Sequence, residues 1–298
     1  MNSAELSQKV KAMAVSLGFD ECAVASVDRE ADDGFDAWLA AGYEAGMAWL
    51  GRTREVRQAV EQYLPGARSV VVLARNYYAE RPEAPPTNGK VSRYAWGRDY
   101  HRVLRKPAQR LAAFLTEKAP GTAYRISIDS GPVRERAWAA RAGLGWIGKN
   151  SLLLRQDGGS WFFLAVIVTT AELAADRPVP DHCGRCQACM EACPTGAIVA
   201  PRVVDSGRCL AYHTIENREE IPERVARSMN GWIFGCDICQ EVCPWNRFAK
   251  VTDEQDFHPR PGNAWLPLAP LLAGNNDGCE AHSLGSPLRR AGLGGLRR

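Results

Sequence analysis

Long apolar runs are missing from the sequence. The longest, residues 161–168, has the length of a strand, whereas a membrane-spanning helix needs roughly 20 apolar residues. The N-terminus has neither the apolar stretch of a secretory signal nor a twin-arginine pair, and residues 3–17 follow an amphipathic helical pattern instead. We therefore expect a cytoplasmic protein that does not enter a membrane.

Histidine is scarce, and neither sign of charge dominates. The 5 histidines include no pair at ligand spacing, and no His-x-x-Glu-His or Walker sequence occurs, which argues against a non-haem metal site and a P-loop. A net charge of +3 gives no global signal for nucleic acid, so any basic surface must be local. With 298 residues, 46% of them hydrophobic, the chain can bury a core in about two domains.

The hydrophobic pattern predicts an α/β (α+β) fold in two parts. Helical patterns alternate with short β-branched or apolar runs, and we expect a layered sheet covered by helices. The expected helices are 3–17, 37–50, 106–118 and 133–142, and the expected strands are 21–27, 69–74, 125–129 and 161–169. The proline-containing linker 176–181 divides a domain at 1–178 from a cysteine-rich domain at 179–298.

Ten cysteines are present, and eight of them lie between Cys183 and Cys243. Clustered thiols in a reducing compartment indicate metal rather than disulfides. The first four follow the spacing C-x2-C-x2-C-x3-C-P of bacterial ferredoxins, in which three thiolates hold one cubane and the fourth reaches the other. Cys22 and Cys279 have no partner at ligand spacing, and we interpret them as incidental or buried thiols.

The second half of the cysteine domain supplies the remaining ligands after an insertion. We predict two [4Fe–4S] clusters in a ferredoxin-like arrangement, each with ligands from both halves. One set is Cys183, Cys186, Cys189 and Cys243, and the other is Cys193, Cys209, Cys236 and Cys239. Four thiolates also suit structural zinc, but zinc ribbons rarely have this spacing, so we favour iron–sulfur.

Two further segments allow both a chemical and a structural interpretation. Residues 90–110 interleave cations with aromatics, as single-stranded RNA recognition does, but a charged helix face over core aromatics gives the same pattern. His101 within it suits hydrogen bonding or an RNA contact better than metal ligation. Asp129 follows a strand and precedes a Ser-Gly-Pro turn. In an apolar pocket it would be a general acid, and otherwise it would cap the next helix.

Four segments together resemble one known family. They are RYAWGRDYH (93–101), IDSGPVRERAWAARAGLGWIGKNSLL (128–153), CGRCQACMEACPTGAI (183–198) and GCDICQEVCPWN (235–246). In this order they are similar to the epoxyqueuosine reductases, which complete queuosine at the wobble position of tRNA. The resemblance covers nearly the whole chain. It implies a cobalamin-binding N-terminal α/β domain that receives electrons from the cluster domain, and it implies a low-potential external electron donor.

The resemblance also implies roles for individual residues. Asp129 stands at the position of the family's proton donor. The positions that contact cobalamin in the family correspond here to Arg57, Ser92, Asp129, Leu153, Leu164, Cys236 and Asp237. The segments 90–110 and 214–218 become candidates for contact with the anticodon stem-loop. Many relatives continue beyond the sequence that ends this chain, so we expect any RNA contact from such an extension to be missing.

Two other functions are compatible with the same cofactors. A cobalamin-dependent reductive dehalogenase would also combine a corrin with paired clusters, but those enzymes usually carry an export signal. An electron-transfer or cobalamin-handling protein without a substrate of its own would not need Asp129 or a basic aromatic segment. Activity on tRNA bearing the epoxide distinguishes the reductase from both.

Overall fold

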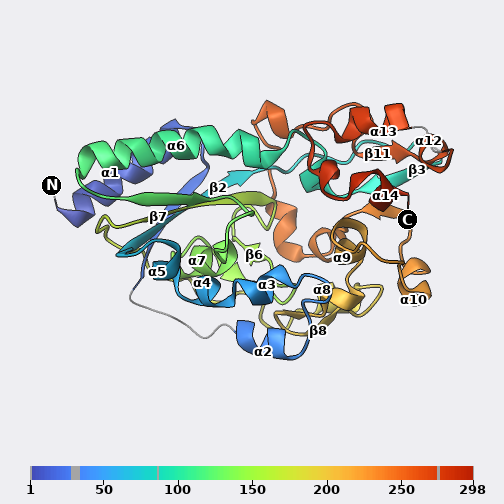
Figure 1. Ribbon diagram of the computed structural model, residues 1–298, viewed down its shortest axis with the longest axis horizontal. Coiled ribbons are helices and arrows are strands. Elements are labelled where there is room, and N and C mark those ends of the chain that lie inside the picture. Colours follow the sequence, from blue (N-terminus) through green and yellow to red (C-terminus); the bar gives the residue numbers. More distant parts are fainter. Residues whose placement is uncertain (1, 28–33, 86, 274–275, 298) are drawn as a thin grey trace.

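A computed structural model describes residues 2–27, 34–85, 87–273 and 276–297. The molecule is elongated, with a four-stranded sheet towards the N-terminal end and a smaller sheet of short strands at the other end (Figure 1). Within the described residues, no helix has both the length and the apolar character needed to cross a bilayer.

The larger sheet is antiparallel throughout, with the strand order β1-β2-β7-β4. Its strands are β1 (Glu21–Ser26), β2 (Ser69–Asn76), β7 (Phe162–Thr169) and β4 (Tyr124–Ser127). The two central strands read SVVVLARN and FFLAVIVT, and six of the eight residues in each are buried. Continuous β-branched runs of this kind suit strands that are covered on both faces.

Helices cover both faces of this sheet (Figure 1). On one face lie α1 (Ser3–Ser16) and α6 (Tyr100–Lys118), and α6 buries Leu104, Ala108, Leu111 and Leu115 at helical spacing. The opposite face packs against α5 (Val60–Tyr63) and α7 (Glu135–Arg141). Three short helices lie beside this layer: α2 (Phe35–Ala40), α3 (Trp49–Arg52) and α4 (Arg54–Gln58).

A second sheet joins segments that are far apart in the sequence. Strand β3 (Asn88–Val91) pairs in parallel with β10 (Trp232–Phe234) and antiparallel with β11 (Trp265–Pro267). The N-terminal range 1–178 therefore contributes a strand to a sheet that otherwise comes from 179–298. The division into domains at 178/179 stays a prediction.

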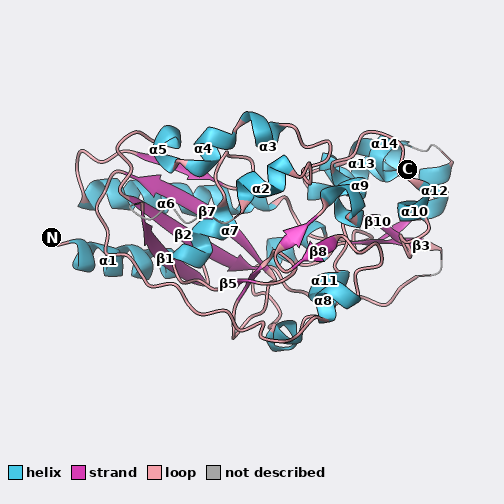
Figure 2. Cartoon of the chain, turned by 90° about the horizontal axis from the view of Figure 1, so that it is seen from below, coloured by secondary structure: helices cyan, strands magenta, loops and turns pink. Residues whose placement is uncertain are grey.

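The cysteine region consists of short elements (Figure 2). Helices α8 (Ala188–Glu191) and α11 (Ile238–Glu241) pack against each other, each within one Cys-x3-Cys-Pro segment. The other strands here are β5 (Trp146–Ile147), β6 (Leu153–Leu154), β8 (Ile198–Ala200) and β9 (Val203–Val204). The remaining helices are α9 (Leu210–Ile215), α10 (Glu223–Ala226), α12 (Leu268–Leu272), α13 (Asn276–Ser283) and α14 (Gly292–Leu296). The 3-10 turns are η1 (Arg93–Ala95), η2 (Ser206–Arg208), η3 (Pro244–Phe248), η4 (Gln255–Phe257) and η5 (Pro287–Arg290).

The predicted fold class is confirmed, and two helix predictions need correction. The helix expected at 37–50 is wrong as a single element. It breaks after α2 because Gly42 and Ala45 have left-handed φ values of 69° and 51°. Helix α6 begins at Tyr100, six residues before the expected start at 106, because Asp99 caps it there. Pro107 lies inside the helix and does not begin it. A proline near the expected start is typical of a first helical turn, which explains the error.

Candidate functional site

Four of the predicted ligands share one cavity. Cys183, Cys186, Cys189 and Cys243 line a space of about 230 Å³ together with Lys149, Asn150, Leu154, His182, Pro244, Trp245 and Arg247. This volume is several times the roughly 30 Å³ of a liquid water molecule. A zinc ion held by four thiolates at about 2.3 Å would need less room, so the cavity fits a cluster better than a single ion.

Local structure directs these thiols inward. Lys149 donates to the carbonyl oxygens of Gly184 and Cys186, each at 2.8 Å, and so ties the first cysteine loop to the N-terminal part of the chain. The Trp146 indole nitrogen lies 3.4 Å from Cys183 Sγ, at hydrogen-bonding distance for sulfur. Cys186 is exposed, so this cavity reaches the molecular surface.

The other four predicted ligands form a more deeply buried group. Burial raises the pKa of the Cys236 thiol to about 12, and the neighbouring Cys209 and Cys193 raise it further. The pKa of Cys239 is raised well above its usual value, first by burial and then by Cys236 and Cys209. Thiols within electrostatic reach of one another suit a metal cluster, because bound iron favours the thiolate form that burial disfavours.

Asp129 lies where β4 gives way to α7, and its backbone is fixed in an unusual conformation. It has a φ of 58°, which aspartate tolerates better than most residues. Its amide donates to Glu135 Oε1 at 2.9 Å, and Ser127 Oγ donates to the same oxygen at 2.8 Å. His101 Nε2 lies 3.4 Å from Asp129 Oδ2. Glu135 therefore holds the backbone, and His101 contacts the carboxylate.

The surroundings of Asp129 form a recess with several charges. The Asp129 side chain is 67% exposed, yet the protein around it acts to raise the pKa of its carboxyl group. The surrounding protein likewise lowers the pKa of Arg57 and of Arg136. The charges of Glu135 and Asp129 act in the opposite direction on both but are the weaker effect. We call the charged surface formed by Arg57, Asp129, Glu135 and Arg136 the acidic recess.

Charge interactions set the ionisation of the two carboxyl groups in the acidic recess. Burial works to raise the pKa of Asp129, but hydrogen bonds from His101 and Tyr100 outweigh it, so the pKa is below its ordinary value. Burial and the Asp129 charge raise the pKa of Glu135 to about 7. Near neutral pH, Asp129 is therefore ionised in the free protein and Glu135 is about half protonated.

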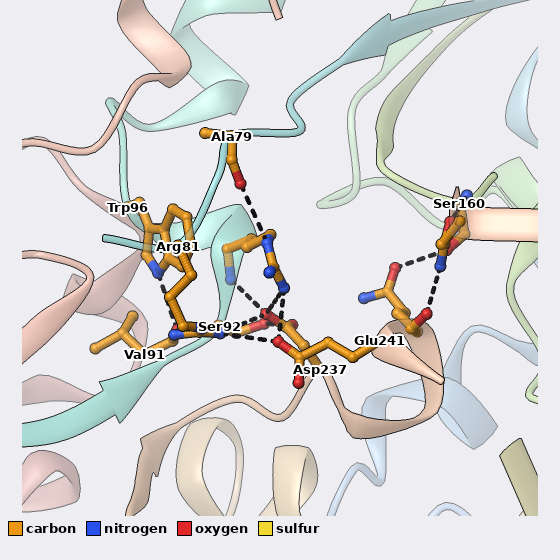
Figure 3. A network of polar contacts seen from close by, with 11 residues as sticks. Ala79, Arg81, Val91, Ser92, Trp96, Ser160, Asp237 and Glu241 are labelled. Carbon is orange, nitrogen blue, oxygen red and sulfur yellow. Dashed lines mark hydrogen bonds and ion pairs between the residues drawn. The ribbon is translucent and has the colours of Figure 1, made fainter. Parts of the chain in front are cut away.

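The predicted cofactor-contacting residue Asp237 is buried in the network of Figure 3. Its side chain is 1% exposed. Its carboxylate accepts hydrogen bonds from Ser92 Oγ and, at 2.8 Å, from the Arg93 amide, and it pairs with Arg81 at 3.2 Å. Burial raises the pKa of Asp237, although these contacts act to lower it. The side chains of Ser92 and Asp237 are thus occupied, and a ligand could contact residue 237 only through its backbone.

Arg81 was not singled out by the sequence analysis, although it anchors this network. Its guanidinium lies 4.8 Å, 5.0 Å and 5.3 Å from the ring centroids of Trp96, Trp232 and Trp265. Burial lowers the pKa of Arg81, and Asp237 opposes this effect. Through these three tryptophans and Asp237, Arg81 joins β10 and β11 to the segment that carries Cys236. Arg81 and the three tryptophans come from four separate segments, so no local sequence pattern reveals their arrangement.

Tyr94 connects the network to the acidic recess. Its pKa is raised well above its usual value, first by burial and then by the charges of Asp129, Glu216 and Asp237. Asp129 and Asp237 therefore both lie within electrostatic reach of one ring. Of the other predicted contacts, Leu153 has a buried side chain and Leu164 is half-buried at the edge of the core.

The basic aromatic segment 90–110 adopts the structural alternative of its two interpretations. Trp96 and Tyr100 are buried in the core and are not available for stacking on bases. Arg93 is also mostly buried and pairs with Glu241 at 2.7 Å. The exposed cations of α6 within this segment are Arg102, Arg105, Lys106 and Arg110. In the segment 214–218, Thr214 is buried.

Comparisons with known proteins agree on one family. A family model described as epoxyqueuosine reductase QueG, DUF1730, matches residues 57–130, and one described as 4Fe-4S double cluster binding domain matches 182–246. An epoxyqueuosine reductase of Synechocystis sp. is 50% identical over 272 residues, which cover 90% of this chain and 93% of that relative.

Solved structures show the same relationship. A crystal structure of epoxyqueuosine reductase with an epoxyqueuosine-modified tRNA stem loop has a TM-score of 0.90 and 29% identity, covering 99% of this chain and 80% of that one. A catabolic reductive dehalogenase has a TM-score of 0.53 and 17% identity, covering 98% of this chain and 36% of that one. The dehalogenase likeness is one of fold alone.

Proposed function

The chain belongs to the epoxyqueuosine reductase family, and from this premise we infer that it reduces epoxyqueuosine to queuosine at the wobble position of tRNA. The observation that carries this conclusion is the high identity with relatives of that activity along nearly their whole length. The chain is an oxidoreductase, and its macromolecular partner is tRNA.

Two [4Fe–4S] clusters are the electron carriers. We propose that Cys183, Cys186, Cys189 and Cys243 hold the cluster nearer the surface, an assignment supported by their shared cavity. Cys193, Cys209, Cys236 and Cys239 hold the other cluster. This assignment is supported by the charge effects of Cys193 and Cys209 on Cys236, and of Cys209 and Cys236 on Cys239. Clusters of this type transfer electrons one at a time at low potential.

Cobalamin is the cofactor at which the substrate is reduced. When bound, it would supply a strongly reducing cobalt centre for opening the epoxide. Proposed contacts are Arg57, Ser92, Asp129, Leu153, Leu164, Cys236 and Asp237. The fit rests on the acidic recess and on Tyr94, whose ring is within electrostatic reach of both Asp129 and Asp237. The burial of the Ser92, Leu153 and Asp237 side chains restricts those three residues to backbone or shape contacts.

Asp129 is the proposed proton donor to the epoxide oxygen. Opening the ring places negative charge on that oxygen, and a positioned carboxylic acid removes the charge by protonating it. The side chain is reachable from the acidic recess while Glu135 fixes its backbone. A bound substrate and cofactor would displace water from the recess and favour the neutral acid, because desolvation raises a carboxyl pKa.

Glu135 is a positioning residue for Asp129, which leads to a prediction. Glu135→Ala removes the acceptor shared by the Asp129 amide and Ser127 Oγ, and we expect a roughly 10- to 100-fold lower rate of single turnover. Glu135→Gln retains an acceptor oxygen and should stay within about threefold of wild type. Rapid-quench assays on cofactor-loaded enzyme check this. Equal losses in the two variants would contradict a positioning role.

We further propose that a low-potential one-electron donor docks where the outer cavity opens. Cys186 is exposed there, and the cations Lys149 and Arg247 line the same cavity. A transient electron-transfer partner with an acidic face suits such a surface, because opposite charge steers weak encounters. We also propose a cytoplasmic location, which the tRNA substrate supports.

The experiment that tests the function uses tRNA carrying epoxyqueuosine. Anaerobically prepared chain loaded with clusters and cobalamin is incubated with this tRNA and a low-potential reductant, and digested nucleosides are separated by mass. The expected product is queuosine, which lacks one oxygen atom relative to the substrate. Reactions without reductant or without cobalamin are the controls. Unchanged epoxyqueuosine in the complete reaction would refute the proposed function.

A further inference from the structure

His101 lies between two carboxylates, one of which is Asp129. Its Nδ1 is 2.7 Å from Asp99 Oδ1, and its Nε2 is 3.4 Å from Asp129 Oδ2. Asp99 also caps α6 by accepting from the His101 amide, and the Tyr100 ring stacks on the imidazole at a centroid distance of 4.1 Å. The ring orientation is therefore fixed. Only the protonated imidazole can donate to both carboxylates at once.

The charges around His101 favour that protonated form. Burial works to lower its pKa, but hydrogen bonds and charge from Asp129 and Asp99 outweigh it and raise the pKa to about 9. At neutral pH the pair is an imidazolium next to a carboxylate. Other charged or titratable groups also interact with the pair or with Asp99. They are Arg57, Tyr94, Tyr100, Arg102, Glu135, Arg136 and Arg290.

The stoichiometry of the reaction requires a second proton source. Converting an epoxide into an alkene and water consumes two electrons and two protons. Asp129 is a carboxylate in the free protein, so it takes up its first proton from water when the substrate binds and raises its pKa. It gives this proton to the epoxide oxygen and is then a carboxylate again. Among the described residues, His101 is the histidine whose ring nitrogen contacts this carboxylate.

We propose that His101 supplies protons to Asp129, so that the pair delivers both protons of each turnover; this rests on the proposed function. As the first C–O bond breaks, Asp129 gives its proton to the oxygen, which becomes a hydroxyl group. The His101 Nε2–H proton then passes to the Asp129 carboxylate. As the second C–O bond breaks, the hydroxyl takes this proton and leaves as water. The two electrons come through the clusters from the external low-potential donor.

Reprotonation of His101 must occur between turnovers. Its side chain is 32% exposed, so water can reach the ring while Asp99 keeps its orientation. The arrangement keeps a proton adjacent to Asp129 even when bound tRNA covers the acidic recess. Asp99 is accordingly a positioning residue for His101.

The test measures single-turnover rates of pre-reduced holoenzyme on tRNA bearing the epoxide, from pH 6 to pH 10. For wild type we expect a rate that falls as pH rises through about 9, because His101 then loses its proton. His101→Gln can bond to Asp129 but carries no exchangeable acid, and we expect an approximately 10²-fold loss and no fall near pH 9. His282→Gln, whose ring contacts Asn263 instead, is the matched control and should behave as wild type.

A second variant changes the pKa of His101 without removing the ring or the helix cap. Asp99→Asn keeps the helix cap, since asparagine caps as well as aspartate, but removes one charge that raises the His101 pKa. We expect its rate to decline at a lower pH than in wild type. An unchanged pH profile in both variants would overturn the relay even if wild type forms queuosine. If wild type forms no queuosine at any pH, the proposed function itself fails.

Discussion

Asp129→Asn is expected to abolish reduction of the epoxide, with a single-turnover rate at least about 10²-fold below wild type. Asparagine has nearly the same shape and tolerates the left-handed backbone conformation of this position, where φ is 58°. It has no acidic proton to give to the departing oxygen. Cluster absorption should remain as in wild type, because the substitution removes no thiol. Corrin absorption should remain too, because asparagine keeps the size and one acceptor oxygen of the aspartate side chain.

A matched control separates lost acidity from altered charge. Asp253→Asn removes a carboxylate that pairs with Arg75 and is 82% exposed, and its rate should match wild type. Both variants change net charge by the same amount, so tRNA binding is compared at equal charge. If Asp129→Asn retains full activity with intact cofactors, Asp129 is not the acid.

Two double substitutions of cysteine should leave different amounts of iron in the protein. The proposed ligand sets cross between the halves of the cysteine domain, so Cys183→Ala with Cys243→Ala damages one cluster only. That variant should keep about four iron atoms per chain, whereas Cys183→Ala with Cys193→Ala should keep almost none. Both variants should lose turnover, since electrons must pass through both clusters. Iron and sulfide analysis of anaerobically purified protein checks the contents.

The alternative assignment reverses these results. If the first four cysteines held one cluster among themselves, loss of Cys183 and Cys193 would spare the other cluster, and loss of Cys183 and Cys243 would damage both. Cys22→Ala is the control, because burial raises the pKa of this thiol to about 12 and it lies apart from the cysteine region. Its iron content should equal that of wild type. The side chain of Cys279 lies outside the described residues.

The sequence predicted the fold class and the family correctly because both depend on local patterns. Buried strands such as 69–74 can be recognised by their continuous β-branched residues. The cysteine spacing likewise depends on a few neighbouring positions. The helix expected at 37–50 failed for a local reason too, since its alanines favour a helix while Gly42 and Ala45 reverse the chain. The assigned site residues stay predictions.

The arrangement around Asp129 and Asp237 could not be read from the sequence. His101 and Asp129 are 28 positions apart, and their contact depends on how α6 lies against β4. Arg81 meets tryptophans from three other segments. Burial also decided the interpretation of 90–110, because Trp96 and Tyr100 have the composition of an RNA-binding surface but pack into the core. Such contacts follow from tertiary packing.

The central claim is that eight thiolates hold two iron–sulfur cubanes beside a bound corrin. Metal and corrin analysis of the anaerobically purified, cobalamin-supplemented chain tests it most directly. The account predicts about eight iron atoms, about eight sulfides and one cobalamin per chain. Tightly held zinc in place of iron, or a chain that binds no corrin, would contradict it.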